Sequence, residues 1–307
     1  MHDLIIIGAG PAGLTAGLYA GRFGLKTVII EKMSVGGQIL LSPGIENFPG
    51  FPESIPTGEL VERFRKQVTD LGVRIESEEV IEIAESKRLK NPIFGIKAQE
   101  KSFEAKSIII ATGAQYKKLG VEGEEKFIGR GVSYCGTCDG PMFKNKEIAL
   151  VGGGDRAIEE AIFLTGYASK VSLIHRRAQL RASKVLEEKA RKNKKINFVL
   201  DSVIEEVSGQ NKVDGVKIKN VKSGVKIKLS CDGVFIFVGI APDTGIVKKL
   251  LDLDEKGFII TDNKMKSSKE GIFACGDCRQ KSLYQVVTAC SDGATAADSA
   301  HKYLLNQ

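Results

Sequence analysis

The sequence Gly8-Ala9-Gly10-Pro11-Ala12-Gly13 follows directly on the apolar run of residues 4–7. A helical pattern covers residues 14–23, so the order is strand, tight turn and helix. In a unit of this kind the first glycine makes the turn, the second lets the backbone approach a pyrophosphate, and the third lets the helix pack closely on the strand. The phosphates would lie at the helix N-terminus, where free N–H groups gather. The chain is therefore predicted to begin with a dinucleotide-binding domain.

The residues that follow support this interpretation. A second strand is expected over residues 27–30, and it ends in Glu31. A carboxylate at the end of this strand can accept hydrogen bonds from ribose hydroxyls. Lys32 comes next and is assigned to the same site. Later, the segment Ser107-Ile108-Ile109-Ile110 leads into Ala-Thr-Gly, and it is interpreted as a return of the chain to the same sheet.

A second glycine-rich stretch, Gly152-Gly153-Gly154-Asp155-Arg156-Ala157, again lies between an apolar strand and a helix. The strand that follows, residues 171–174, ends in His175-Arg176-Arg177, and Arg181 comes shortly after. A site for NAD would place a carboxylate there. Arginine side chains match a phosphate group bidentately, so these residues indicate a second site that binds NADPH. The alternative is a basic helix start that faces solvent.

Between the two glycine-rich stretches lies Cys135-Gly136-Thr137-Cys138-Asp139-Gly140. A Cys-x-x-Cys pair in a reducing compartment is a reversible dithiol, half of a zinc site or a coincidence. Its position beside a nucleotide site indicates that electrons pass from a nucleotide to a disulfide. Such a dithiol needs some stabilisation of its thiolate, and Asp139 can accept or donate the accompanying proton. An ordinary turn or cap residue is the alternative role for Asp139.

A second Cys-x-x-Cys pair flanks Gly276-Asp277. The two pairs together would supply four zinc ligands, but they lie much farther apart than the roughly 12 to 20 residues of a compact zinc site. The histidines form no metal-binding cluster either, so no metal is expected. The remaining cysteines are interpreted as packing residues: Cys231, Cys275, Cys278 and Cys290.

The composition is typical of a globular enzyme with two domains. The chain has 307 residues, of which 42% are hydrophobic and 27% are charged, and this length exceeds what one ordinary core accommodates. The 45 Lys and Arg residues outnumber the 38 Asp and Glu residues for a net charge of +7. This excess is mild, and the basic residues 184–195 are typical of a solvent-facing helix. The N-terminus shows no basic leader, and no apolar run approaches the roughly 20 residues of a membrane span. We therefore expect a cytoplasmic protein without nucleic-acid or membrane partners.

These observations predict an α/β fold of two Rossmann-like dinucleotide-binding domains. Residues 1–113 form the first part of one domain, residues 114–242 form the inserted second domain, and residues 243–307 complete the first. The first domain is therefore discontinuous. Further elements are expected as short strands over residues 73–110 and 198–238, and as helices over residues 58–71 and about 291–305.

With these motifs in view, the chain resembles the low-molecular-weight thioredoxin reductases, which are NADPH-dependent flavoproteins. The resemblance runs almost from end to end, and a Cys-x-x-Cys-Asp motif inside the NADPH domain is specific to this branch. It implies a homodimer in which the discontinuous domain holds FAD and the thiols pass electrons to thioredoxin. On this resemblance Cys138 faces the flavin, Cys135 attacks the disulfide of thioredoxin, and Asp139 transfers the proton.

The motifs and the resemblance together assign the cofactor-binding residues. The FAD site is expected to contain Gly8, Gly10, Pro11, Ala12, Gly13, Glu31, Lys32, Gly37, Gln38, Asn47, Val80, Ala111, Thr112, Gly113, Gly276, Asp277, Gln285 and Val286. The NADPH site is expected to contain Gly153, Gly154, Asp155, Arg156, Ala157, His175, Arg176, Arg177 and Arg181.

Two positions depart from the family pattern, and both bear on the electron donor. Tyr284 stands where the family usually carries an arginine, and a cation there would stabilise the reduced flavin. Arg156 replaces a usual Ser or Thr, where it would contact the pyrophosphate or obstruct the nicotinamide. Because both the dithiol and the nicotinamide must reach the flavin, a hinge rotation about residues 113–117 and 240–245 is also expected.

Three classes of function remain open. The first is NADPH-dependent disulfide reduction. The second class contains two kinds of enzyme. One is a relative that is reduced by another donor such as ferredoxin, and Arg176, Arg177 and Arg181 disfavour it. The other is a ferredoxin–NADP reductase of similar fold, but such an enzyme lacks the dithiol. The third is a non-enzymatic redox sensor or a zinc-holding scaffold. Enzymes similar to glutathione reductase are disfavoured, because their thiols lie in the FAD domain and no cysteine occurs between Gly36 and Gly50.

Overall fold

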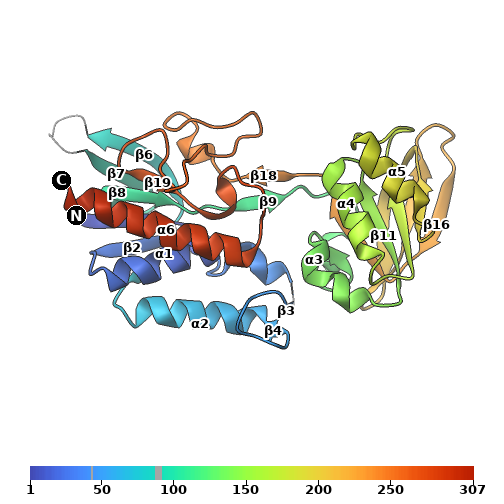
Figure 1. The fold of residues 1–307 in the computed structure, drawn as a ribbon, viewed down its shortest axis with the longest axis horizontal. Helices are drawn as coiled ribbons and strands as arrows, with labels where there is room; N and C mark the ends of the chain where they lie inside the picture. Colours follow the sequence, from blue (N-terminus) through green and yellow to red (C-terminus); the bar gives the residue numbers. More distant parts are fainter. Residues whose placement is uncertain (43, 87–91) are drawn as a thin grey trace. The chain divides into compact units, whose positions relative to one another are not determined.

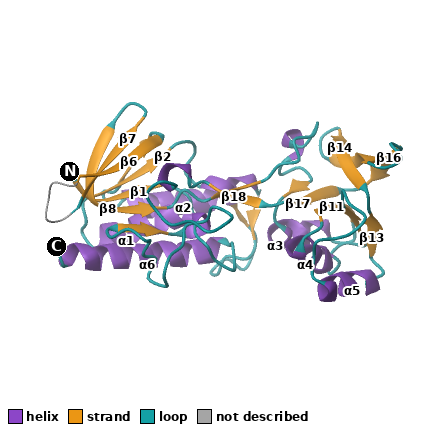
Figure 2. Ribbon diagram, turned by 90° about the horizontal axis from the view of Figure 1, so that it is seen from above, coloured by secondary structure: helices purple, strands orange, loops and turns teal. Residues whose placement is uncertain are grey.

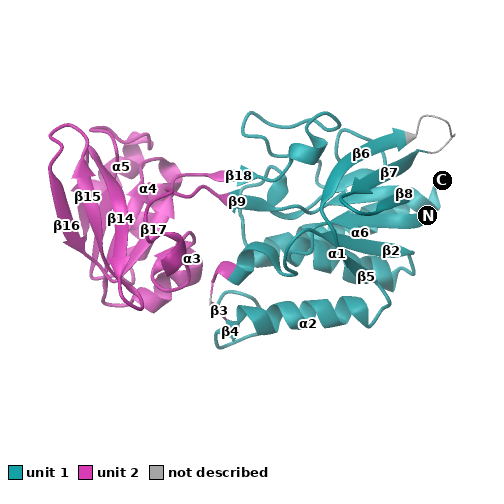
Figure 3. Cartoon of the chain, turned by 180° about the vertical axis from the view of Figure 1, so that it is seen from behind, with its two compact units in different colours: residues 1–40, 46–115, 241–307 teal, residues 41–45, 116–240 magenta. Residues whose placement is uncertain are grey.

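The computed structural model describes residues 1–42, 44–86 and 92–307 (Figure 1). Residues 43 and 87–91 lie outside the described part. The prediction of short strands over residues 73–110 therefore falls in part on residues that are not described. The described chain forms two compact units (Figure 3). The first unit comprises Met1–Leu40, Glu46–Gln115 and Ala241–Gln307, and the second comprises Leu41–Ile45 and Tyr116–Ile240.

The first unit is built on a seven-stranded sheet in the order β5-β2-β1-β8-β7-β6, with β19 also paired to β8. Strands β5, β2, β1, β8 and β19 run parallel, whereas β6 and β7 pair antiparallel. The central strands are near-continuous apolar runs, because both faces of a parallel sheet are covered. The strands are β1 His2–Ile7, β2 Thr27–Glu31, β5 Arg74–Ser77, β6 Val80–Ser86, β7 Ile93–Ala98, β8 Ser102–Ile110 and β19 Ile272–Ala274.

Two helices of the first unit, α1 and α6, pack side by side against this sheet (Figures 1 and 2). Helix α6 begins at Val286, earlier than expected, because the side chains of Gln285 and Thr288 form a capping box at its start. The helices are α1 Pro11–Arg22, α2 Thr57–Thr69 and α6 Val286–Leu305. Shorter elements of this part of the chain are η1 Gly37–Leu41, β3 Gly44–Ile45, β4 Ile55–Pro56, η4 Gly245–Val247 and η5 Gly276–Cys278.

The second unit contains a five-stranded parallel sheet in the order β10-β17-β11-β12-β13 and a three-stranded antiparallel sheet, β14-β15-β16. The strands are β10 Val132–Ser133, β11 Glu147–Gly152, β12 Lys170–Ile174, β13 Ile196–Val199, β14 Ser202–Gly209, β15 Val213–Asn220, β16 Lys226–Ser230 and β17 Gly233–Phe237. The helices are α3 Gly136–Asp139, α4 Asp155–Leu164 and α5 Lys184–Lys192, with short turns η2 Glu125–Phe127 and η3 Gly140–Phe143. The basic stretch expected to face solvent is helix α5, of which only Ala190 is buried.

The chain passes between the units along β9 Ala114–Tyr116 and β18 Ile240–Pro242, which pair with each other. The predicted α/β class is confirmed, since each unit carries a parallel sheet with a glycine-rich turn between its first central strand and the following helix. Within the described ranges, no helix has both the length and the apolar character needed to cross a bilayer.

Candidate active site

The first glycine-rich loop, residues 8–13, has space only for glycine at two of its positions. Gly8 has a φ of 109°, and a Cβ placed on it would lie 2.3 Å from the carbonyl oxygen of Ala111. A Cβ on Gly13 would lie 1.8 Å from the carbonyl oxygen of Gly8. Helix α1 then begins at Pro11, and no side chain caps its N-terminus at Gly10. Its first N–H groups are therefore available to an anionic group.

Glu31, at the end of β2, is fastened to the same loop. One carboxylate oxygen accepts from the N–H of Ala9 at 2.7 Å, and the other accepts from the N–H of Met33 at 2.9 Å. The carboxylate thus lies beside the loop, as a ribose-binding residue requires. The ammonium of the neighbouring Lys32 forms an ion pair with Asp243 at 2.5 Å.

The turn η5 brings Gly276 and Asp277 to the first loop. Gly276 has a φ of 75°, and a Cβ on it would lie 2.7 Å from the Cβ of Ala12. The N–H of Gly276 donates to the carboxylate of Asp292 on α6 at 3.2 Å. Asp277 is therefore held near the start of α1, although the two segments are far apart in the sequence.

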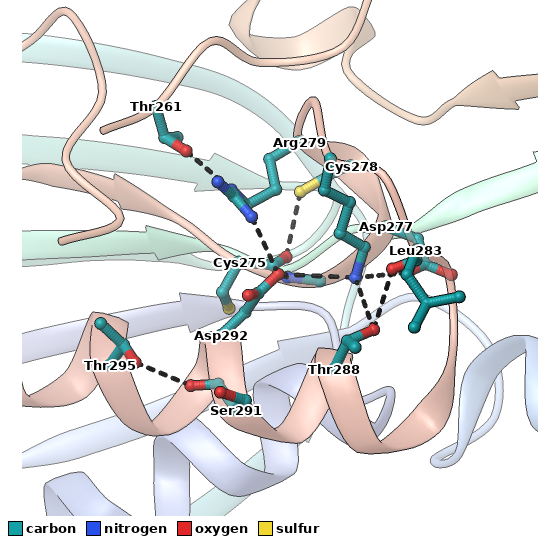
Figure 4. Close-up of polar contacts among 12 residues, drawn as sticks. Thr261, Cys275, Asp277, Cys278, Arg279, Leu283, Thr288, Ser291, Asp292 and Thr295 are labelled. Carbon is teal, nitrogen blue, oxygen red and sulfur yellow. Dashed lines mark hydrogen bonds and ion pairs between the residues drawn. The ribbon is translucent and has the colours of Figure 1, made fainter. Parts of the chain in front are cut away.

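A network of largely buried charged side chains joins this turn to α6 (Figure 4). The side chain of Lys281 is only 7% exposed, and its ammonium lies 2.9 Å from Asp277 and 3.4 Å from Asp292. Arg279 adds an ion pair to Asp292 at 3.3 Å and donates to Thr261 at 2.7 Å. Sequence reasoning missed Lys281, Arg279 and Asp292, because polar residues in a loop and on a helix carry no signal of burial. The one hint in the sequence was the opposite charge of Lys281, four residues after Asp277.

The remaining residues that are predicted for the flavin site lie in several different parts of the first unit. The amide of Asn47 donates to the side-chain oxygen of Gln285, the N-cap of α6, at 3.1 Å. Thr112 donates to the carbonyl of Asp243 at 2.6 Å. Val80 packs into the core beneath the sheet, so its side chain is enclosed by apolar residues. The others lie at the turns already described or beside them: Gly37 and Gln38 in η1, Ala111 and Gly113 after β8, and Val286 at the start of α6.

In the second unit, Cys135 and Cys138 form a disulfide across the first turn of α3, with their Cα atoms 5.3 Å apart. The sulfur of Cys135 accepts from the N–H of Cys138 at 3.2 Å. Asp139 is buried at the end of the helix and accepts from the hydroxyl of Ser133 at 2.5 Å. The hydroxyl of Ser133 also accepts from the N–H of Cys135 at 3.1 Å. Ser133 therefore joins the carboxylate of Asp139 to residues 135–138, which we call the redox turn. Sequence reasoning did not find Ser133, whose role depends on the fold of the turn.

The second glycine-rich loop, residues 152–157, contains both crowded and open glycines. A Cβ on Gly153 would lie 2.3 Å from the imidazole ring of His175, whereas a Cβ on Gly154 would meet nothing within 4 Å. Gly154 is the N-cap of α4, and no side chain caps that helix. The N–H of Arg181 donates to the carbonyl of Gly153 at 2.6 Å, which brings the arginine segment to the loop.

The predicted phosphate-binding arginines gather beside this loop. Arg176, Arg177 and Arg181 are exposed, and none of them forms an ion pair with a described residue. His175 is buried, and its burial lowers the pKa of the imidazole, with Arg181 and Arg176 adding to the effect. The histidine therefore packs as a neutral ring under the loop while the guanidinium groups remain free.

Arg156 and Asp155, at the start of α4, both contact neighbouring segments of the second unit. The guanidinium of Arg156 lies 5.9 Å from the ring centroid of Tyr116 and 5.9 Å from that of Phe237, within the range of cation–π attraction. A carboxylate oxygen of Asp155 accepts from the N–H of Ser183 at 2.7 Å. Both interactions fasten neighbouring segments to the loop.

The cysteines outside the disulfide, which are predicted to be packing residues, are buried or half-buried free thiols. Cys275 and Cys278 are fully buried free thiols, and burial raises the pKa of Cys278 to about 11. Cys231 is buried as well, and its pKa is raised to about 12. Cys290 is half-buried, with its sulfur 3.9 Å from the carbonyl of Pro11. No group of three or more metal-ligating side chains occurs among the described residues.

Comparisons with known proteins agree with this geometry. The family model described as pyridine nucleotide-disulphide oxidoreductase matches residues 2–293. A thioredoxin reductase of Treponema pallidum is 45% identical, with 99% of this chain and 97% of that protein covered. The crystal structure of thioredoxin reductase from Streptococcus pyogenes superposes with a TM-score of 0.94 at 45% identity, covering 100% of this chain and 99% of that chain. The Lactococcus lactis thioredoxin reductase described as the FR conformation gives a TM-score of 0.69 at 42% identity and covers both chains fully.

These matches confirm the resemblance to the low-molecular-weight thioredoxin reductases and the Rossmann-like architecture. They also establish the coarser statement that the protein is an oxidoreductase that uses flavin and nicotinamide nucleotides. The chain belongs to the pyridine nucleotide-disulphide oxidoreductase family.

Proposed function

We propose that the protein is a thioredoxin reductase that takes electrons from NADPH, passes them through FAD to the Cys135–Cys138 pair and delivers them to thioredoxin. The observation that carries this proposal is the disulfide at the first turn of α3, in the same unit as an arginine-rich nucleotide loop. The relatives support it, because they carry the name thioredoxin reductase and match the chain over nearly its full length.

The first unit fits the dinucleotide portion of FAD. The uncapped N-terminus of α1 would receive the pyrophosphate, since its free N–H groups favour negative charge. Glu31 would accept from ribose hydroxyls, and Asp277, fixed by Lys281, would hold the ribityl or phosphate portion. When bound, FAD supplies two-electron transfer between the nicotinamide and the disulfide.

The second unit fits NADPH in preference to NADH. The open space at Gly154 and the uncapped start of α4 would accommodate the pyrophosphate. Arg176, Arg177 and Arg181 would bind the 2′-phosphate, because their guanidinium groups are exposed and lack ion-pair partners among the described residues. The same arginines argue against the alternative in which ferredoxin is the donor, since a ferredoxin-reduced enzyme would not need a phosphate-binding cluster.

The redox segment supports an exchange reaction with a second disulfide. After reduction breaks the S–S bond, the N–H of Cys138 would stabilise negative charge on the sulfur of Cys135. The thiolate of Cys135 would attack the disulfide of thioredoxin, and Cys138 would then attack the mixed disulfide and release the reduced partner. Asp139, oriented by Ser133, would hold the proton that Cys138 gives up in that step.

Assembly and movement remain predictions. We propose a cytoplasmic homodimer, by resemblance, and a hinge at residues 113–117 and 240–245, where the chain passes between the units. A covalent crosslink between the units should abolish turnover with thioredoxin. Turnover that survives complete crosslinking would exclude the hinge.

The decisive experiment is an anaerobic titration of the purified flavoprotein with NADPH. We expect the flavin absorbance to bleach and to recover when oxidised thioredoxin is added, and we expect this recovery to be lost in Cys135→Ser and kept in Cys231→Ser. Bleaching by reduced ferredoxin but not by NADPH would favour the other donor. A colourless protein that contains zinc would refute the proposal.

A further inference from the structure

Helix α4 places a buried carboxyl group against the redox turn. Helices α3 and α4 lie side by side within the second unit (Figures 1 and 2). The Oε2 atom of Glu160 on α4 is buried and has no hydrogen-bond partner among the residues that the structure describes. A Cβ placed on Gly136 would lie 2.0 Å from that oxygen. The carboxyl therefore contacts the residue bonded directly to Cys135.

This contact depends on the close approach of the two helices. Gly136 and Gly140, at the two ends of α3, both face α4, and a Cβ on Gly140 would lie 3.0 Å from a methyl group of Leu164. Without side chains at these two positions, the redox segment can pack directly on α4. Glu160 fills the place that a side chain on Gly136 would otherwise take.

The charges around Glu160 do not compensate its burial. Arg156, one turn earlier on α4, favours the ionised form, and Glu159 disfavours it. Burial is the larger effect, and it raises the pKa of Glu160. The titratable groups on α3 and at its N-cap are the carboxyl of Asp139 and, after reduction, the thiols of Cys138 and Cys135. Helix α5 also packs on α4, but the charged groups that shift the pKa of Glu160 both lie on α4 itself.

We propose that Glu160 is a positioning residue whose carboxyl changes its protonation with the redox state of the Cys135–Cys138 pair and thereby sets the pH dependence of the dithiol potential. The proposal deepens the function proposed above, since it rests on that disulfide being reduced and reoxidised during turnover. The disulfide is a feature of the family to which the chain belongs. The carboxyl of Glu160 takes no part in the electron and proton transfers proposed above.

Two electrons and one proton convert the disulfide into one thiol and one thiolate, so the turn gains one negative charge when the S–S bond breaks. If Glu160 is already ionised, two negative charges share a poorly solvated region, and the carboxylate takes up a second proton from solvent. If Glu160 is already protonated, no second proton is needed. The electrons come from reduced pyridine nucleotide in the proposed reaction, or from a small dithiol in the experiment below.

The sign of the effect follows from this charge balance. Above the pKa of Glu160, its negative charge opposes thiolate formation and lowers the potential of the pair. Replacing it with a neutral amide should therefore favour the reduced form at alkaline pH, by about tenfold in the equilibrium constant, which is about 30 mV for a two-electron couple. At acidic pH the wild-type carboxyl is neutral too, so the difference should vanish.

The test equilibrates the flavin-loaded protein with mixtures of reduced and oxidised dithiothreitol over a series of pH values. The reduced fraction is measured by alkylation and mass spectrometry of the peptide that carries Cys135 and Cys138. We expect Glu160→Gln to differ from the wild type only at alkaline pH, and Glu160→Asp to restore part of the pH dependence. The control is Glu188→Gln, which removes the same charge from an exposed site on α5 and should leave the potential unchanged.

A constant offset at every pH would indicate only an altered packing of the turn and would overturn the proposal, as would the absence of any difference. If Glu160→Gln does not give a folded protein, Glu160→Asp decides alone: its pH dependence should be weaker than that of the wild type, and an unchanged dependence overturns the proposal. Neither NADPH nor thioredoxin takes part in the measurement. Its result is therefore independent of whether the proposed donor and partner are correct.

Discussion

Replacing Gly153 and Gly154 by alanine, one at a time, should separate the stability of the second nucleotide loop from its binding. A methyl group on Gly153 would lie 2.3 Å from the ring of His175, whereas one on Gly154 would meet nothing within 4 Å. His175 is itself buried, at 6% exposure, so its ring has little room to move away. Gly153→Ala should therefore lower the free energy of unfolding by about 2 kcal/mol, the usual cost of overpacking a core. Gly154→Ala should leave it unchanged or raise it by about 0.5 kcal/mol, because the backbone there suits alanine.

Nucleotide binding should respond to both variants, for different reasons. The open space at Gly154 is where a pyrophosphate would lie, so its methyl group should weaken NADP⁺ binding by about tenfold or more while the protein stays stable. Gly153→Ala should weaken binding only as far as it disturbs the loop. Denaturant unfolding followed by circular dichroism measures the first quantity, and calorimetric titration with NADP⁺ measures the second.

A double variant tests the cause of the instability. Removing the ring in His175→Ala should make the additional cost of Gly153→Ala much smaller, because the two positions interact directly. The reasoning is refuted if Gly154→Ala destabilises the protein as much as Gly153→Ala does, or if the cost of Gly153→Ala is the same with and without the imidazole ring.

Three further predictions address the charged groups. Arg177→Gln should reduce the preference for NADPH over NADH by about tenfold in kcat/KM, since it removes one of the proposed phosphate contacts. The control is Arg191→Gln, because Arg191 lies in an ion pair with Glu187, and equal effects of the two variants would contradict the assignment. Lys281→Met should destabilise the first unit by about 3 kcal/mol and release FAD more readily, because it leaves Asp277 without its buried partner. The exposed Lys302→Met is the control, and unchanged FAD retention would count against the network. Burial lowers the pKa of His175, so the unfolded state binds more protons than the folded state as the pH falls through 6.5. Acid should therefore reduce the free energy of unfolding of the wild type more than that of His175→Gln. Parallel plots of unfolding free energy against pH would disprove this.

Local sequence patterns were sufficient to predict the two units of strand, glycine-rich loop and helix. The order of apolar strand, glycine-rich turn and helix at residues 4–23 predicts β1, the first loop and α1, because each part of that order has a local steric cause. The same holds for β11 and α4 in the second unit. The start of α6 was missed, because it is set by the capping box between Gln285 and Thr288 and not by a hydrophobic period.

The functions of single polar residues depended on contacts between distant segments. Lys32 and Val80 are both expected in the flavin site, and only the fold shows what surrounds them. The ammonium of Lys32 pairs with Asp243, more than two hundred residues away in the chain, and the side chain of Val80 packs into the core. Ser133, Lys281 and Glu160 carry no motif, and only the fold shows which group lies against each of them.

The amino-acid sequence alone determined the α/β class, the two glycine-rich loops, the reactive cysteine pair and the arginine cluster, because these features depend on residues that are neighbours in the chain. Only the tertiary structure decided which carboxylates and ammonium groups are buried and what they face. Burial and ion pairing arise when segments far apart in sequence pack together, and the energy of a charge depends on that packing far more than on its position in the chain.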